Sequence, residues 1–148
     1  MVKTFGSGIL LPTTGGTATS LDYYETYTHT TSWNGAYGAG SVSGDVTYTR
    51  VGRMVTAVFP VILGTCTATQ VLWQITNSPT RFRPPTDLYF TCGTIQVGAG
   101  PILSAIGVIY ISAGGNNQIH NGAGGATFNS AGSPTVGLYQ SVAVTYSV

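Results

Sequence analysis

Apolar and polar residues alternate along several stretches of the chain, with the two-residue period of half-buried β-strands. No window keeps the i, i+3, i+4, i+7 apolar pattern of an amphipathic helix for three turns. The alternation and the many β-branched residues predict strands over residues 23–30, 45–51, 53–62, 71–76, 88–97, 102–111 and 141–148. Segments rich in Gly and Pro separate these strands, so the pattern predicts an all-β, jelly-roll-like antiparallel β-sandwich.

The strongest local signal is a hairpin over residues 45–62. In its first strand Val46 and Tyr48 alternate with threonines, as expected for a strand with one buried face. Gly52 supplies the turn, because glycine adopts a positive φ without a steric penalty. Pro60 cannot donate to a strand ladder and therefore predicts the end of the second strand or a sheet edge.

The segments between the strands predict loops and one arm. Residues 33–44, 77–87 and 113–125 are rich in Gly, Ser, Asn or Pro and predict loops, the last with room for one short strand. Residues 1–20 carry too few large apolar side chains for a core of their own and predict an extended N-terminal arm. Residues 21–148 then form a single β-sandwich domain.

The low charge of the chain excludes some classes of function. Charged residues make up 6% of the 148 residues and hydrophobic residues 43%, which is enough apolar content for a folded core. The net charge is +1 and the five cations form no cluster, so no nucleic-acid partner is expected. The longest apolar run, residues 102–111, is about half the length of a membrane-spanning helix, so no membrane insertion is expected either. A domain so poor in charge favours permanent assembly.

The two cysteines, Cys66 and Cys92, are too few for a disulfide framework or a four-thiolate zinc site. We interpret them as free, half-buried thiols on strands, because free Cys packs as a small hydrophobic residue. One disulfide between them is the alternative.

Residues suited to catalysis or metal binding are few. The candidates are His29, His120, Asp22, Glu25, Asp45 and Asp87. No spacing places two acids together, as a glycan depolymerase would require, and no metal-ligand motif is present. We therefore predict a protein that is not an enzyme, with no catalytic site, no metal and no cofactor.

Aromatic and amide side chains are the remaining candidates for a ligand site. Exposed Tyr and Trp rings stack on sugars, and several lie close together in this sequence. The alternative is that these rings pack in the core or at a subunit interface. The candidate ligand-binding residues are Tyr23, Tyr27, Trp33, Tyr37, Asn116 and Asn117.

Two further groups are candidates for contacts rather than chemistry. Arg81 and Arg83 flank Phe82 in a Pro-bounded loop, where they either bind a carboxylate or brace the loop. The candidate contacts with a neighbouring subunit are Leu10, Leu11 and Pro12 in the arm and Tyr24 on the first strand of the domain.

Four stretches together resemble a known pattern: residues 10–25 (LLPTTGGTATSLDYYE), 48–62 (YTRVGRMVTAVFPVI), 81–90 (RFRPPTDLYF) and the ending VAVTYSV. They are similar to β-rich terminal modules of phage tail-fibre proteins and of surface or fibre proteins of large DNA viruses. In those modules an R-x-G-x-x-V-T hairpin is followed by an F-R-P loop and a G-x-I-x-I strand. The matching residues are Arg50, Gly52, Val55 and Thr56, then Phe82, Arg83 and Pro84, then Gly107 to Ile111.

The resemblance implies a jelly-roll-like head, usually a homotrimer, that attaches a virus particle to its host or decorates it. We therefore expect a virion structural protein on the particle surface, either a fibre head or a capsid-decoration module, made in the host cytoplasm. Its expected partners are its own copies, other virion or capsid proteins, and a host-surface glycan or receptor. The alternative is a carbohydrate-binding module that uses exposed Tyr and Trp residues.

Overall fold

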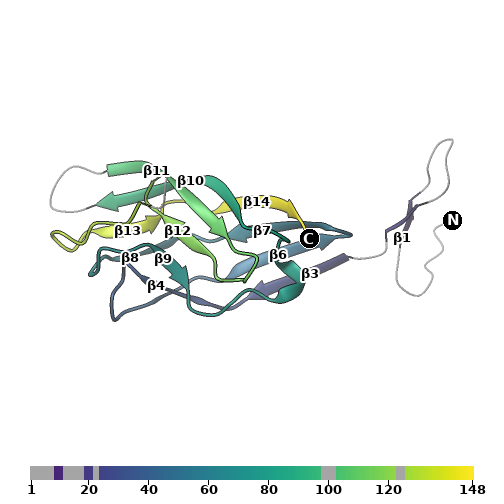
Figure 1. Cartoon of the computed structure of the whole chain (residues 1–148), viewed down its shortest axis with the longest axis horizontal. Coiled ribbons are helices and arrows are strands. Elements are labelled where there is room, and N and C mark those ends of the chain that lie inside the picture. Colours follow the sequence, from purple (N-terminus) through teal and green to yellow (C-terminus); the bar gives the residue numbers. More distant parts are fainter. Residues whose placement is uncertain (1–8, 12–18, 22–23, 98–102, 123–125) are drawn as a thin grey trace.

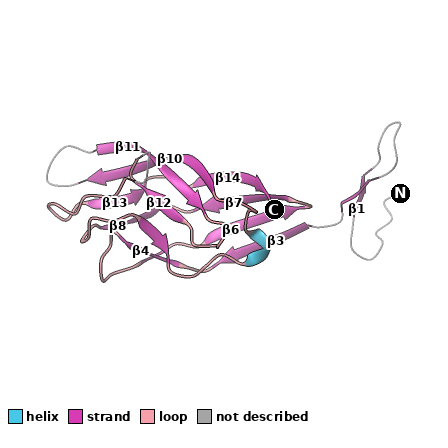
Figure 2. Cartoon of the chain, in the orientation of Figure 1, coloured by secondary structure: helices cyan, strands magenta, loops and turns pink. Residues whose placement is uncertain are grey.

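Strands form nearly all the regular structure of the computed structural model, which describes residues 9–11, 19–21, 24–97, 103–122 and 126–148 (Figure 1, Figure 2). The strands are β1 (Ile9–Leu11), β2 (Thr19–Leu21), β3 (Tyr24–His29), β4 (Ser32–Gly35), β5 (Val42–Ser43), β6 (Val46–Val51), β7 (Met54–Phe59), β8 (Ile62–Thr65), β9 (Leu72–Gln74), β10 (Leu88–Val97), β11 (Leu103–Ile111), β12 (Gln118–His120), β13 (Thr135–Leu138) and β14 (Val142–Ser147). A short 3-10 helix spans Thr80–Phe82. The strands pair antiparallel in two main sheets, which confirms the predicted all-β antiparallel sandwich.

The four-stranded sheet has the order β14-β7-β6-β3 and contains the predicted hairpin. Alternation decides which side chains face the core: Val46 and Tyr48 of β6 are buried, whereas the threonines between and after them face outward. Gly52 forms the β6–β7 turn with φ +58°. Strand β7 ends at Phe59, directly before Pro60, as the sequence predicted.

The eight-stranded sheet has the order β5-β4-β9-β12-β11-β10-β13-β8 and curls on itself. Its two terminal strands, β5 and β8, lie against each other, so the sheet almost closes into a barrel. Tyr37 lies where the two ends meet, and its hydroxyl donates to the carbonyl of Val136 at 3.2 Å. A side chain at Gly64 would meet the Tyr37 ring at 2.8 Å, so only glycine allows β8 this close to the ring.

Large apolar side chains fill the space between the sheets. The largest fully buried ones are Trp33, Tyr48, Phe59, Phe82, Phe128, Ile62, Leu72, Ile109, Ile119, Leu138 and Val46. They come from both sheets and from the loops between strands, so the core is shared by the whole domain. Burial of this apolar surface, at about 25 cal/mol per Å², is the main favourable contribution to folding.

A buried hydrogen-bond network around Ser78 crosses the core from one sheet to the other. The Ser78 hydroxyl lies 2.7 Å from the Tyr48 hydroxyl on β6 and 3.3 Å from Oε1 of Gln74 on β9. It also accepts a hydrogen bond from Nδ2 of Asn117 at 2.9 Å. Nε of Arg83 donates to the Ser78 carbonyl at 2.7 Å. These bonds fix the Pro-rich segment between β9 and β10 against both sheets.

The structure differs from the predicted elements at several places. The strand expected over 53–62 ends at Phe59, and a separate strand that was not predicted, β8, follows Pro60 and Val61. Residues 33–44, expected to be a loop, contain most of β4 and all of β5, because the buried Trp33 holds this segment in the sheet. Strand β13 was not predicted, since its sequence TVGL is short and includes a glycine. The short strand expected within 113–125 is confirmed as β12.

The described part of the predicted arm is a hairpin and not a single extended segment. β1 and β2 pair antiparallel, with Ile9 opposite Leu21 and Leu11 opposite Thr19. Each strand is only three residues long. Strands this short give no clear alternation within a segment that contains many Gly and Pro residues, so the sequence did not predict them. Pro12 lies outside the described residues, and the division at residue 20 stays a prediction.

Both cysteines are free, as the first of the two interpretations predicted, but both are buried and not half-buried. Cys92 lies on β10 and Cys66 directly follows β8. Burial raises the pKa of the Cys92 thiol to about 11, because the apolar surroundings disfavour the thiolate.

Gly137 on β13 provides a test of the curled sheet. It has φ +139°, and a Cβ there would overlap the carbonyl oxygen of Ile62 on β8. We expect Gly137→Ala to destabilise the protein by about 3 kcal/mol, through backbone strain and loss of close β8–β13 packing. Chemical denaturation measures this. The matched control is Gly93→Ala on the neighbouring β10, where no atom lies within 4 Å of the added Cβ. Equal midpoints for the two variants would contradict this account.

The buried Cys92 thiol predicts a pH dependence of stability. In the unfolded chain this thiol ionises near its ordinary pKa of 9.0, whereas in the folded protein its pKa is about 11. Between these two pKa values the thiol loses its proton more readily in the unfolded chain, which stabilises the unfolded state relative to the folded state. We expect the free energy of unfolding to fall between about pH 9 and about pH 11, and the fall to be smaller in Cys92→Ala. Urea denaturation in reductant tests this, and identical pH slopes would refute it.

Candidate functional site

The aromatic residues predicted to stack on a ligand are mostly covered. Trp33 is fully buried, and its Nε1 donates to the carbonyl of Gly44 at 3.0 Å. Tyr37 is 4% exposed inside the curled sheet. The prediction of a ligand site is therefore wrong for Trp33 and Tyr37, because both rings serve as core packing.

Tyr27 and its neighbours form a braced cluster. The Tyr27 ring is half-buried and stacks on Phe82, with 5.7 Å between ring centroids. Cζ of Arg81 lies 4.8 Å from the centroid of each of these two rings, and Nε of Arg81 is 2.8 Å from Oε1 of Glu25. Arg83 bonds to the loop backbone at Ser78. Both arginines therefore brace the loop, and the cluster leaves little of Tyr27 for a ligand.

The other predicted contact residues fall into different environments. Asn116 is exposed, but Asn117 is 1% exposed and belongs to the Ser78 network, so the prediction of Asn117 as a ligand residue is wrong. Tyr24 is 66% exposed on the outer face of β3. Leu10 and Leu11 lie on β1, and Tyr23 lies outside the described residues.

The structure instead brings polar and aromatic side chains into a line on the outer face of the eight-stranded sheet. Strand register places five residues opposite one another in sequence across β4, β9, β12, β11 and β10. We call this line the outer row; its residues are Asn34, Trp73, Gln118, Tyr110 and Tyr89. Each is flanked along its strand by more deeply placed residues, as Trp73 is by the buried Leu72 and Gln74, so the row faces away from the core.

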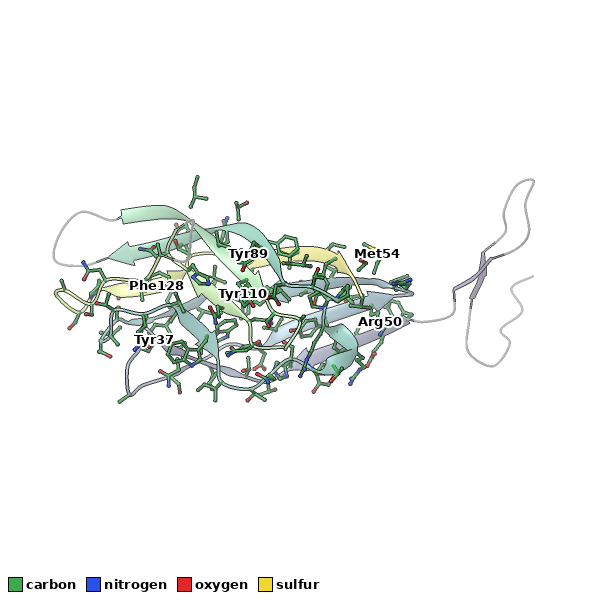
Figure 3. All side chains as sticks on the ribbon, viewed as in Figure 1. Tyr37, Arg50, Met54, Tyr89, Tyr110 and Phe128 are labelled. Carbon is green, nitrogen blue, oxygen red and sulfur yellow. The ribbon has the colours of Figure 1, made fainter. Side chains whose placement is uncertain are left out.

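One end of the outer row is held by hydrogen bonds. The rings of Tyr89 and Tyr110 lie 5.1 Å apart between centroids (Figure 3), and Tyr89 is 68% exposed. The Tyr110 hydroxyl donates to Oδ2 of Asp87 at 2.7 Å, and the backbone N–H of Ala113 donates to Oδ1 at 2.9 Å. The hydrogen bond from Tyr110 lowers the pKa of the Asp87 carboxyl, which is therefore ionised at neutral pH.

The other end of the outer row depends on a glycine. Gly35 on β4 has φ +86°, and a Cβ there would come within 2.7 Å of the Trp73 ring. The indole of Trp73 therefore lies against the Gly35 backbone, half-buried, which restricts its rotation. Two fixed aromatic groups thus flank Gln118, whose amide both donates and accepts hydrogen bonds.

This arrangement has the features of a shallow binding surface. It presents aromatic rings for stacking and an amide and hydroxyls for hydrogen bonding, all on strands, with the Asp87 carboxylate directly before β10. Among the described residues, no three His, Cys, Asp or Glu side chains are grouped as metal ligands would be. Within the same part of the chain, no helix is long and apolar enough to cross a membrane.

The sequence indicates only part of the outer row. Tyr89 alternates with the apolar Leu88 and Phe90, which assigns its ring to the outer side of its strand. Trp73 shares its side with the apolar Val71 and Ile75, so the pattern alone would place its ring toward the core. That these two sides belong to the same face depends on strand order, because β9 and β10 are separated by β12 and β11.

Comparison with known proteins supports the fold. No protein-family model matches the chain, and no curated protein sequence matches it. Among solved structures, it is similar to the reovirus attachment protein sigma1, crystallised in complex with alpha-2,3-sialyllactose, with TM-score 0.52 and 12% identity. The match covers 84% of this chain and 65% of the sigma1 chain, which is less than two thirds of its length. The likeness shows that the two chains share a fold. A link to phage tail fibres stays a prediction.

Proposed function

We propose that this chain is an attachment module on the surface of a virus particle, and that its outer row binds a host-surface glycan. The observation that carries the proposal is the register that lines up Trp73, Gln118, Tyr110 and Tyr89 on one exposed face. The similarity to sigma1, an attachment protein crystallised with a sialylated sugar, supports the same role for this fold. The module would act as a homotrimer and contact other virion proteins, as the sequence resemblance implies.

The chemistry of the outer row favours an uncharged sugar. Aromatic rings stack on the C–H faces of hexoses, and the side chains around them offer donors and acceptors for sugar hydroxyls. The row contains no Lys or Arg, and the ionised Asp87 at its end would repel a ligand carboxylate. We therefore propose neutral hexose units as the ligand, in contrast to the sialylated sugar of the sigma1 complex.

The absence of enzymatic activity is part of this proposal. Two carboxylates of the described chain already have structural partners, since Glu25 pairs with Arg81 and Asp87 accepts hydrogen bonds from Tyr110 and Ala113. Hydrolysis of a glycan needs two carboxyl groups flanking one bond. The surface therefore suits binding and release without turnover of the sugar.

Substitution of Tyr89 tests the proposed site. A glycan array identifies the sugar, and titration of the wild-type protein with that sugar then gives the affinity. We expect Tyr89→Ala to weaken binding at least about tenfold, because it removes the most exposed ring of the row. Trp73→Ala should have an effect of similar size at the other end.

The matched control is Tyr24→Ala. Tyr24 is 66% exposed and Tyr89 68%, so both substitutions remove an equally exposed ring, but Tyr24 lies on the other sheet. We expect Tyr24→Ala to leave glycan affinity unchanged. An array without any binding, or equal losses in Tyr89→Ala and Tyr24→Ala, would refute the site. Binding restricted to sialylated sugars would refute the neutral ligand.

A further inference from the structure

The outer face of the four-stranded sheet consists of three rows of four residues without any charged side chain. Strand register places each row across β3, β6, β7 and β14. We call this surface the threonine face; its rows are Tyr24, Val51, Met54 and Ser147, then Thr26, Thr49, Thr56 and Thr145, then Thr28, Thr47, Val58 and Ala143. None of these residues is buried in the single chain.

The central row is made entirely of threonines. The hydroxyls of Thr56 and Thr145 lie 3.0 Å apart, within hydrogen-bond distance across β7 and β14. A hydroxyl donates one hydrogen bond and accepts others, so a row of hydroxyls can bond to an identical row. β-Branched side chains are also stiff, which lowers the entropy lost when such a surface becomes covered.

Apolar side chains border the threonine row on both sides. Tyr24 is 66% exposed, Met54 is 49% exposed, and Val51 and Val58 are each 37% exposed. Arg53 lies at the β6–β7 turn beside Met54 of the face, and its Nε donates to the carbonyl of Val148 at 3.1 Å. Covering this face would therefore bury apolar groups without desolvating an ion.

We infer that the threonine face is the contact surface for a second copy of this chain. Two copies of an uncharged face never place like charges opposite each other, and their hydroxyls can pair with one another. This face-to-face contact has two-fold symmetry, so it is separate from the three-fold contact of the proposed homotrimer. Flat sheet faces pack on each other at about 10 Å, so side chains of this size fill the space between them. The inference goes beyond glycan binding, and it stands or falls independently of the outer row, which belongs to the other sheet.

The face is small compared with the interfaces of stable protein complexes. Four strands about 4.8 Å apart and six residues long cover on the order of 400 Å² in plane. This is about half of what one partner contributes to a standard-size interface. We therefore expect association at micromolar protein concentration, and the measurement must cover that range.

Analytical ultracentrifugation of the full chain without glycan tests the inference. We expect the wild-type protein to associate between about 1 and 100 µM, the range of weak complexes with small interfaces. Thr56→Lys places a charge at the centre of the face and should weaken association more than about tenfold. Thr135→Lys, at an exposed strand position of the eight-stranded sheet, is the matched control and should associate like the wild type.

The outcomes separate the inference from its alternatives. A monomeric wild type overturns it, and so does association that Thr56→Lys leaves unchanged. Equal loss in Thr135→Lys also overturns it, because the effect would then not belong to this face. Thermal melting checks that each variant is folded. If Thr56→Lys does not fold, Met54→Lys replaces it, since that side chain is 49% exposed and the substitution leaves the core intact.

Discussion

The hydroxyl of Ser78 is the point through which the two sheets and the longest Pro-rich loop are joined. It lies within hydrogen-bond distance of Tyr48 on one sheet and of Gln74 and Asn117 on the other. Polar groups this deep in a core are costly unless they are hydrogen-bonded, so the bonds must be made together or not at all. The network thereby fixes the register of the loop that carries Arg81, Phe82 and Arg83, and it closes one end of the sandwich.

Because the core is filled, any binding site must lie on the outer faces of the sheets. The rings of Trp33 and Tyr37 are buried in the core, and the Tyr27 ring packs against Phe82 and Arg81. The two surfaces that remain are both poor in charge, yet they differ in chemistry. The outer row offers rings beside an amide and a carboxylate, which suits a sugar. The threonine face offers hydroxyls and small apolar groups, which suits its own copy.

Alternation along the chain was sufficient to predict the longer strands and, in the β6–β7 hairpin, the face that each side chain occupies. Two local features were predicted correctly: the alternation of the buried Val46 and Tyr48 with outward-facing threonines, and the hairpin turn at Gly52. Strand order depends on residues far apart in the sequence, and it determines the features that the sequence did not predict. Trp33 lies in a Gly-rich segment that becomes a strand only because it pairs with β9. Asn117, in an apparently exposed loop, is buried because distant chain segments converge on Ser78. The outer row could not be assembled without the order of five strands.

The position of the outer row on strands, with its side chains turned away from the core, uncouples recognition from stability. Exchange of Gln118 or Tyr89 for another residue would leave the packed interior and the Ser78 network as they are, since neither side chain takes part in them. If the row binds the proposed ligand, single substitutions at these two positions would change ligand preference without disturbing the packed interior. Gly35, next to the row, behaves differently: a larger residue there would displace the Trp73 indole, so this backbone position sets the placement of one ring of the surface.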